Sequence, residues 1–222
     1  GGLARPARAR ARGGGDVSGS ALLFHEPDPP KATPRDAFDF YPTPHNVGRV
    51  LREWWASEGV TFGARDQFLD PAAGEGDLVR SMRDSDDIGP TFWHAFELRA
   101  SCEDALEDVA ENVAIGDALA AEWPSAHVVA NPPFALLDAF WLRIAEHRAR
   151  HRAWCAVLTP VAWWNAEKRR GYVRPDVLLA LGWRPTFRAK AGPAHKGSQD
   201  FAWSILAPTA KPFTEWRRVE KP

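Results

Sequence analysis

Cysteine is scarce in this chain, since Cys102 and Cys155 are the only two among 222 residues. Each stands alone in an apolar stretch, without the closely spaced cysteine and histidine partners that a zinc site requires. We therefore expect two buried thiols, a reducing compartment and no metal site.

Long apolar runs are missing as well. No stretch is long enough to cross a bilayer and no signal-peptide pattern is present, which predicts a soluble, cytoplasmic protein with no membrane partner. At 222 residues and 45% hydrophobic content, the chain is sufficient for one domain with a sizeable core.

A surplus of charge of one sign is also absent, because the formal net charge is −1. The distribution of charge is nevertheless uneven. Residues 141–200 contain twelve lysines and arginines against four acids, whereas residues 84–117 are acidic. This pattern is compatible either with solvated helix faces or with a side of the molecule that binds a polyanion.

The first 35 residues lack the features of a folded domain. Residues 1–20 are rich in Gly, Ala and Arg, have no aromatic side chain and do not begin with Met, which indicates a disordered basic arm or a non-native extension. Residues 21–35 are Pro-rich and predict an extended strap. We expect one folded domain over 36–208 and a short tail over 209–222.

Short apolar runs separated by turn residues predict alternating strands and helices. We expect strands at 67–70, 92–97, 113–117, 128–131, 154–159, 183–188 and 201–206. Helices are expected at 45–57, at 99–111, after residue 136 and, as a short helix, at 175–181. No helix fits between the last two strands, so these should form an antiparallel hairpin at the sheet edge.

A Gly-rich turn, Asp70-Pro-Ala-Ala-Gly-Glu-Gly76, follows the first strand. Such a turn between a strand and a helix lets a ligand approach the backbone closely. The third glycine of the dinucleotide fingerprint is missing, and Asp70 and Asp77 add negative charge that disfavours a phosphate. The turn therefore suits a ligand that carries an ammonium or sulfonium group.

Polar residues end four successive strands, namely Asp70, Glu97, Asp117 and Asn131. The carboxyl ends of parallel strands form the ligand-binding edge of open α/β sheets, so we expect these side chains to meet at one site. Glu97 stands one βα unit after the Gly turn, where an acid reaches ribose hydroxyls in doubly wound folds.

The stretch Asn131-Pro-Pro-Phe134 ends the fourth strand and has two interpretations. Asn-Pro-Pro is turn chemistry wherever it occurs. It is also a candidate pocket for a planar amine, because carbonyls around Pro132 and Pro133 lack some usual backbone partners and Asn131 adds a side-chain oxygen. Phe134 adds a ring on which a base or an amide can stack.

Residues 38–44, Phe-Asp-Phe-Tyr-Pro-Thr-Pro, should be extended, because each proline disfavours helix in the residue before it. This segment presents Thr43 from a rigid frame. Thr43 also has a purely structural interpretation as the N-terminal cap of the helix that follows.

The chain contains, in this order, Tyr41-Pro-Thr-Pro44, the turn Asp70–Gly76, Glu97, Gly116-Asp117 and Asn131-Pro-Pro-Phe134. Together these motifs resemble those of S-adenosylmethionine-dependent amino-methyltransferases. The pattern is most similar to DNA adenine-N6 methyltransferases, particularly small phage-type ones, and it covers roughly residues 38–206. The resemblance implies an α/β, Rossmann-like class I methyltransferase fold, with a seven-stranded mixed sheet, an antiparallel last strand and helices on both faces. It also implies S-adenosylmethionine as cofactor and DNA as partner, with RNA left open.

The resemblance assigns roles to individual residues. Cofactor-binding residues would be Tyr41, Thr43, Asp70, Pro71, Ala72, Gly74, Gly76, Glu97, Asp117 and Asn131. Glu97 would hold the ribose and Asp117 the adenine. The target amine would be held by the expected catalytic residues Asn131, Pro132, Pro133 and Phe134.

Contacts to the rest of the target are expected from a basic, aromatic segment and from the loop at 192–200. The candidate side chains are Trp163, Trp164, Lys168, Arg169, Arg170, His195, Lys196 and Ser198. We expect no separate target-recognition domain of the kind that many relatives have, because residues 117 and 131 are too close together and only a short tail follows residue 206.

Other substrates fit the same pocket, because any planar NH₂ group could be held there. Cytosine N4, an RNA base amine and a glutamine side chain stay open, although relatives that act on cytosine more often carry Ser or Asp in place of Asn131. A non-catalytic nucleic-acid-binding protein on this fold is a further alternative, which the intact Asn131–Phe134 stretch disfavours.

Overall fold

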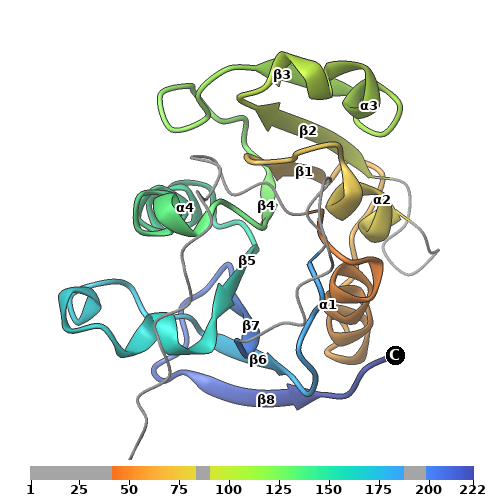
Figure 1. Ribbon diagram of the computed structural model, residues 1–222. Coiled ribbons are helices and arrows are strands. Elements are labelled where there is room, and N and C mark those ends of the chain that lie inside the picture. The colour runs from red at the N-terminus through yellow and green to blue at the C-terminus, as the bar shows by residue number, and fades with distance from the viewer. Residues whose placement is uncertain (1–41, 84–90, 188–198) are drawn as a thin grey trace, which may run out of the picture. The chain divides into compact units, whose positions relative to one another are not determined.

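The computed structural model in Figure 1 describes residues 42–83, 91–187 and 199–222. Tyr41, His195, Lys196, Ser198 and the arm and strap at 1–35 lie outside the described residues. Among the described residues, no helix is long and apolar enough to cross a membrane.

Helices and strands alternate over most of the described chain. The α-helices are α1 (His45–Ser57), α2 (Asp77–Arg83), α3 (Glu103–Glu107) and α4 (Leu137–His151). The strands are β1 (Gln67–Asp70), β2 (Phe92–Glu97), β3 (Asn112–Ile115), β4 (His127–Ala130), β5 (Cys155–Pro160), β6 (Val177–Leu181), β7 (Phe201–Leu206) and β8 (Glu215–Val219). Short 3₁₀ turns are η1 (Ala100–Cys102), η2 (Phe134–Leu136), η3 (Val161–Asn165) and η4 (Glu167–Arg169).

The described strands form one mixed sheet in the order β3-β2-β1-β4-β5-β7-β6-β8. Every neighbouring pair is parallel except those that include β7, which runs antiparallel to both β5 and β6. The chain order reverses between β1 and β4, and the crevice beyond the carboxyl ends of such strands is where open α/β sheets bind ligands.

Helices cover both faces of the sheet, as expected. On one face, buried side chains of α1, α2 and α3 pack with alternate residues of the strands, including Phe68, Trp93 and Trp203. On the other face, α4 and η3 pack against the remaining strand residues, such as Val128 and Val157. Alternation of side chains along each strand therefore produces two hydrophobic layers. Cys102 and Cys155 are both buried and unbonded to each other, which confirms the expectation of buried thiols.

Two predictions about the second half of the sheet were wrong. Residues 175–181 were expected to form a short helix but contain β6. A strand was expected at 183–188, but residues 183–187, the part of it that the structure describes, are irregular. Val177-Leu-Leu-Ala-Leu181 is a short apolar run between Pro175 and Gly182, and periodicity alone does not distinguish a buried strand from a helix in such a run. Pro185 lacks the N–H that a ladder requires.

The described residues form eight strands of the sheet rather than the seven expected. The antiparallel pair was expected between 183–188 and 201–206 at the sheet edge; instead β7 runs antiparallel between β5 and β6, and β8 pairs parallel with β6 and takes the edge position. The expected tail therefore contains a strand. Sequence pattern did not reveal it because Glu215-Trp-Arg-Arg-Val219 is exposed and has no apolar alternation.

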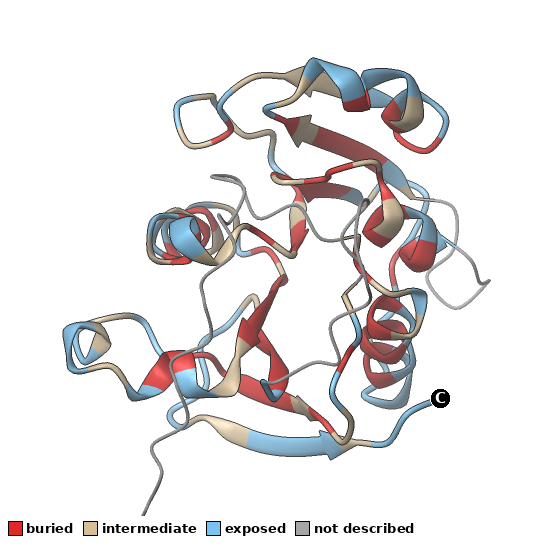
Figure 2. Ribbon diagram, viewed as in Figure 1, coloured by how far each residue is buried: buried red, intermediate tan, exposed pale blue. Residues whose placement is uncertain are grey.

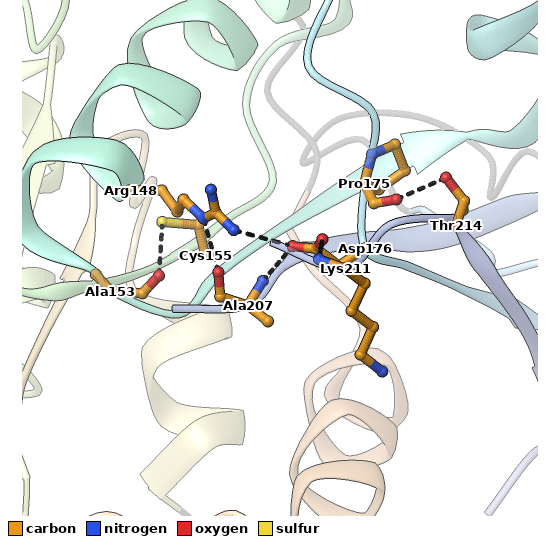
Figure 3. Close-up of polar contacts among 8 residues, drawn as sticks. All are labelled: Arg148, Ala153, Cys155, Pro175, Asp176, Ala207, Lys211 and Thr214. Carbon is orange, nitrogen blue, oxygen red and sulfur yellow. Dashed lines mark hydrogen bonds and ion pairs between the residues drawn. The ribbon is translucent and has the colours of Figure 1, made fainter. Parts of the chain in front are cut away.

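A buried carboxylate secures the connection that leads to β8. Asp176 accepts hydrogen bonds from the backbone N–H groups of Ala207 (2.8 Å) and Lys211 (2.5 Å), and Arg148 lies 3.5 Å from it (Figure 3). The Thr214 hydroxyl donates to the Pro175 carbonyl at 2.7 Å. Side-chain hydrogen bonds thus join the residues just before β6 to the connection between β7 and β8.

Candidate functional site

One cavity lies beyond the carboxyl ends of β1, β2, β3 and β4. Strand-end residues predicted from the sequence reach it together, namely Asp70, Glu97, Asp117 and Asn131. Its lining also includes Thr43, most of the Gly-rich turn and the Pro132–Phe134 stretch. Because the four strands are parallel, residues far apart in the sequence meet at a single edge, as the sequence analysis expected.

The Gly-rich turn folds back onto the second strand. The Gly74 N–H donates to Glu97 Oε2 at 2.8 Å, and the Ala73 N–H donates to the Phe96 carbonyl at 2.9 Å. Gly74 and Gly76 have φ values of 59° and 84°, which a residue with a side chain rarely adopts. A Cβ at Gly76 would lie 2.5 Å from Val109 Cγ2, so this glycine also permits close packing against the residues that follow α3.

Glu97 is held from two sides. Its side chain is 7% exposed, its Oε2 accepts the Gly74 N–H, and its Oε1 accepts the backbone N–H of Arg99 at 3.0 Å and the Arg99 Nε–H at 2.7 Å. A carboxylate can accept about four hydrogen bonds, so this one is oriented by the protein while keeping capacity for a ligand hydroxyl.

Asp70 lies at the bottom of the site and is 1% exposed. Burial raises the pKa of Asp70 from 3.8 to about 7. The Ala72 N–H, which donates to Oδ1 at 3.1 Å, opposes this rise, and the negative charge of Glu97 adds to it. Asp117 is exposed, and its Oδ1 accepts the Leu119 N–H at 2.8 Å. The cavity therefore combines the buried carboxyl groups of Asp70 and Glu97 with the exposed carboxylate of Asp117.

Thr43 is tied to the amine-pocket candidate rather than to the helix. Asn131 Nδ2 donates to Thr43 Oγ1 at 3.0 Å across 88 positions of sequence, whereas the N-cap of α1 is Pro44 and no side chain caps the helix. The capping interpretation of Thr43 is therefore wrong. The bond to Thr43 holds the Asn131 side-chain amide in one orientation. The amide oxygen is the acceptor that this side chain can still offer to a ligand.

The two prolines present different carbonyls. The Leu136 N–H donates to the Pro133 carbonyl at 2.9 Å and begins η2, whereas no hydrogen bond among the described residues is directed at the Pro132 carbonyl. Phe134 rests on Phe201, with ring centroids 5.5 Å apart, and Phe201 in turn contacts Phe187. Packing therefore fixes the aromatic wall beside Asn131.

The predicted substrate-contacting residues outside the cavity have varied positions. Trp163 and Trp164 are each 8% exposed and belong to the core against Trp141. Arg169 lies over the Trp163 ring at 4.3 Å and binds Asp138, as does Lys168 at 2.6 Å. Arg170 is on the surface, with its side chain 76% exposed. None of these five lines the cavity described above.

Several cavity residues were not anticipated. Leu98, Arg99, Ala118, Leu136, Phe140 and Phe187 also line it. Leu98, Arg99 and Ala118 directly follow predicted strand-end acids, so their positions were accessible from the sequence. The position of Phe187 was not, because this residue was expected inside a strand at 183–188, whereas it lies in an irregular segment after β6. Among the described residues, no group of three His, Cys, Asp or Glu side chains is arranged to hold a metal ion.

Known proteins resemble this chain in structure but not in sequence. No protein-family model matches the sequence, and no curated protein matches it. Several solved structures are similar in fold. One is a type I restriction-modification system methyltransferase subunit from Streptococcus thermophilus, with 16% identity and a TM-score of 0.52, over 81% of this chain and 47% of that chain.

Another similar structure is the 23S rRNA methyltransferase ErmE, with 16% identity and a TM-score of 0.53, over 78% of this chain and 71% of that chain. The chain has a methyltransferase-like fold. It spans about half the length of the type I subunit.

Proposed function

We propose that this chain transfers a methyl group from S-adenosylmethionine to the exocyclic N6 amine of adenine in DNA. The observation that carries the proposal is that Asn131 and the Pro132–Phe134 stretch line the same cavity as the Gly-rich turn and the strand-end carboxylates. A cofactor region and an amine pocket are therefore adjacent.

The residues of the cavity fit this cofactor. Glu97 and Asp117 offer acceptors for hydroxyl and amine donors, and the acidic lining that disfavours phosphate suits a ligand with ammonium and sulfonium charges. The bound cofactor would supply an activated methyl group on a sulfonium. The protein then has to align the amine, and positioning of this kind can contribute about 7–11 kcal/mol.

Asn131 and Pro132 would act on the amine itself. An amine conjugated to an aromatic ring is a poor nucleophile because its lone pair is delocalised. Hydrogen bonds from its two protons to the Asn131 side-chain oxygen and the Pro132 carbonyl favour a pyramidal nitrogen, and they strengthen as positive charge develops there. The base would stack on Phe134 after leaving its duplex, which costs a few kcal/mol of unstacking.

RNA is the second candidate partner. One similar structure is an rRNA methyltransferase and another is a methyltransferase subunit of a type I restriction-modification system, so these likenesses support a nucleic-acid substrate without deciding between DNA and RNA. The surface cations Lys168 and Arg170, with side chains 64% and 76% exposed, are proposed contacts to phosphate in either case.

Calorimetry tests the cofactor half of the proposal. The wild-type chain should bind S-adenosylmethionine without nucleic acid, and Glu97→Ala and Asp117→Ala should each weaken binding by about 1–3 kcal/mol through lost charge-assisted hydrogen bonds. Leu142→Ala, at an exposed position of α4 outside the cavity, is the matched control. Absence of binding heat for the wild type, or unchanged affinity in folded Glu97→Ala, would refute the assignment.

Methyl transfer to DNA, RNA and protein pools tests the acceptor half. Asn131→Ala should abolish transfer while changing cofactor affinity only a few fold, and Phe134→Ala should lower turnover less, through loss of about 1–3 kcal/mol of stacking. Labelled adenine in DNA digests is the expected product. Near wild-type turnover in folded Asn131→Ala, or label in protein alone, would contradict the proposed pocket.

A further inference from the structure

β8 is an edge strand that exposes large aromatic side chains. Among the described strands it pairs only with β6, and Figure 2 shows it largely in the colour of exposed residues. Trp216 is 61% exposed and Phe213, just before the strand, is 69% exposed. Natural sheets usually protect an edge with charged side chains, Pro or a bulge; Glu215–Val219 contains no Pro, and its charged residues Glu215, Arg217 and Arg218 flank the exposed Trp216.

The backbone direction of β8 is set by its bonds to the β6 region. The Glu215 N–H donates to the Asp176 carbonyl at 2.9 Å, and the Val219 carbonyl accepts the Gly182 N–H at 2.7 Å. Backbone groups alternate between the two edges of a strand, so those of Trp216 and Arg218 are directed away from β6. This outer edge is a template for another strand.

The side chains of β8 divide between the two sheet faces. Glu215 is in register with Val177, which belongs to the core layer of α1, and Trp216 is in register with Leu178, which belongs to the layer of α4. Glu215 and Arg217 therefore share one face, and Trp216 and Arg218 share the other.

We propose that β8 pairs antiparallel with β8 of a second copy of this chain, around a two-fold axis at Trp216. In this register Trp216 lies opposite Trp216 of the second copy, and the two residues exchange backbone hydrogen bonds because their N–H and C=O groups both face outward. Glu215 lies opposite Arg217 of the second copy, and by symmetry the same ion pair forms twice.

Other registers and partners are less complementary. A register centred on Arg217 places two arginines opposite each other, which is unfavourable. A nucleic acid would require cations that can turn to phosphate, whereas Arg217 pairs with Glu215 and Arg218 with Glu220 within the chain. Self-association can exchange the Glu215–Arg217 pair within the chain for the same pair between chains, and it lets the exposed tryptophans pack on each other.

Cysteine cross-linking of the whole chain tests the register. Trp216→Cys should form a disulfide-linked dimer under mild oxidation, because directly opposite residues in this pair are about 5.5 Å apart at Cα. Arg217→Cys is the matched control and should not cross-link, since its opposite residue is Glu215. The native cysteines are buried and do not interfere. Cross-linking of Arg217→Cys alone, or of neither variant, overturns the proposed register.

Charge reversal tests the interface without oxidation. Sedimentation over a concentration series should show a monomer–dimer equilibrium, which Glu215→Arg or Arg217→Glu should each weaken by about tenfold. The double variant should restore it, because both inter-chain ion pairs re-form with exchanged signs. Thermal unfolding of each variant verifies the fold, which matters because Glu215 also binds Lys211.

The proposal is overturned if the wild-type chain stays monomeric at all concentrations, or if the double variant does not dimerise. A monomer whose affinity for DNA or RNA falls in Trp216→Ala would assign this edge to nucleic acid instead. None of these measurements requires methyl transfer, so the interface and the proposed function can fail separately.

Discussion

Asp70 is a carboxyl group that folding removes almost completely from water. Its pKa rises to about 7 by burial, and the charge of Glu97 adds to the rise. The site therefore contains a carboxyl group that takes up and releases its proton near neutral pH, beside the oriented side chain of Glu97. The electrostatic character of the cavity should change across the physiological pH range.

This shift predicts how stability depends on pH. The unfolded chain releases the Asp70 proton near pH 3.8 and the folded chain near pH 7, so the folded chain binds more protons in between and the free energy of unfolding falls as pH rises through that window. Asp70→Asn keeps the Oδ1 acceptor for the Ala72 N–H and removes the charge. It should be more stable than the wild type at pH 8, by up to about 4 kcal/mol, and similar at pH 4.

Urea unfolding at pH 4, 6 and 8 measures this difference. Asp104→Asn, at an exposed position of α3, is the control and should leave the pH dependence unchanged. Parallel stability curves for the wild type and Asp70→Asn would show that Asp70 ionises normally in the folded protein.

At the scale of elements, η4 is anchored to the start of α4 by one acid. Asp138 accepts hydrogen bonds from Arg169 Nε at 2.6 Å, from Arg169 Nη2 at 3.1 Å and from Lys168 Nζ at 2.6 Å. These bonds lower the pKa of Asp138 to about 2, and Arg169 has the largest effect. Arg169 also donates to the Trp163 carbonyl at 2.6 Å, so its guanidinium joins three segments.

Adjacent arginines in this segment should consequently behave differently. Arg169→Ala should lower the midpoint of unfolding, at about 1–3 kcal/mol, because it removes two of the three hydrogen bonds to Asp138 and the donor to the Trp163 carbonyl. Arg170→Ala should leave stability unchanged but reduce the salt dependence of DNA binding by about one charge. Thermal unfolding and binding at two or more salt concentrations distinguish the two. Equal effects of both variants on stability would contradict the anchoring role.

The first half of the fold could be predicted from local pattern. Strands β1 and β2 and helix α1 have the predicted bounds, because Gly, Pro and acid residues punctuate each apolar run there. The second half could not. Both faces of β6 are buried, so its sequence is a continuous apolar run without the alternation that indicates a strand, and it was mistaken for a helix. β8 was missed because pairing to β6 and the bonds of Asp176 hold it in place, rather than burial of its side chains.

The site followed from the sequence where strand ends determine it. Asp70, Glu97, Asp117 and Asn131 meet because parallel strands align their carboxyl ends, and that requires only the order of the elements. The Asn131–Thr43 bond and the aromatic support of Phe134 by Phe201 depend on tertiary packing, which no local pattern encodes. For the same reason, the burial of Trp163 and Trp164 was not distinguished from a role on the surface.

At the scale of the whole molecule, the described elements are accounted for by one sheet and the helices on its faces. Sequence readout needs side chains that reach base edges, usually from a helix, a ribbon or a dedicated domain. We therefore predict that this chain methylates short or relaxed targets, and that single-stranded or distorted DNA is as good a substrate as duplex because unstacking costs less there.

Single-molecule sequencing of DNA methylated to completion by the chain checks this expectation. Modified adenines should occur in many contexts that share at most a few bases. A single long recognition sequence, with unmodified adenines elsewhere, would show that the chain reads far more of its target than the described elements provide.

The place of β7 between β5 and β6 has a consequence for synthesis on the ribosome. Strand β7 is made after both neighbours, yet it is the strand that joins them. Until Leu206 has emerged, β5 and β6 have no partner on their facing edges, and the apolar side chains of β6 have no sheet to enter. Late in translation, the nascent chain should therefore expose two strand edges with unpaired N–H and C=O groups. In this state, chaperone binding competes with aggregation.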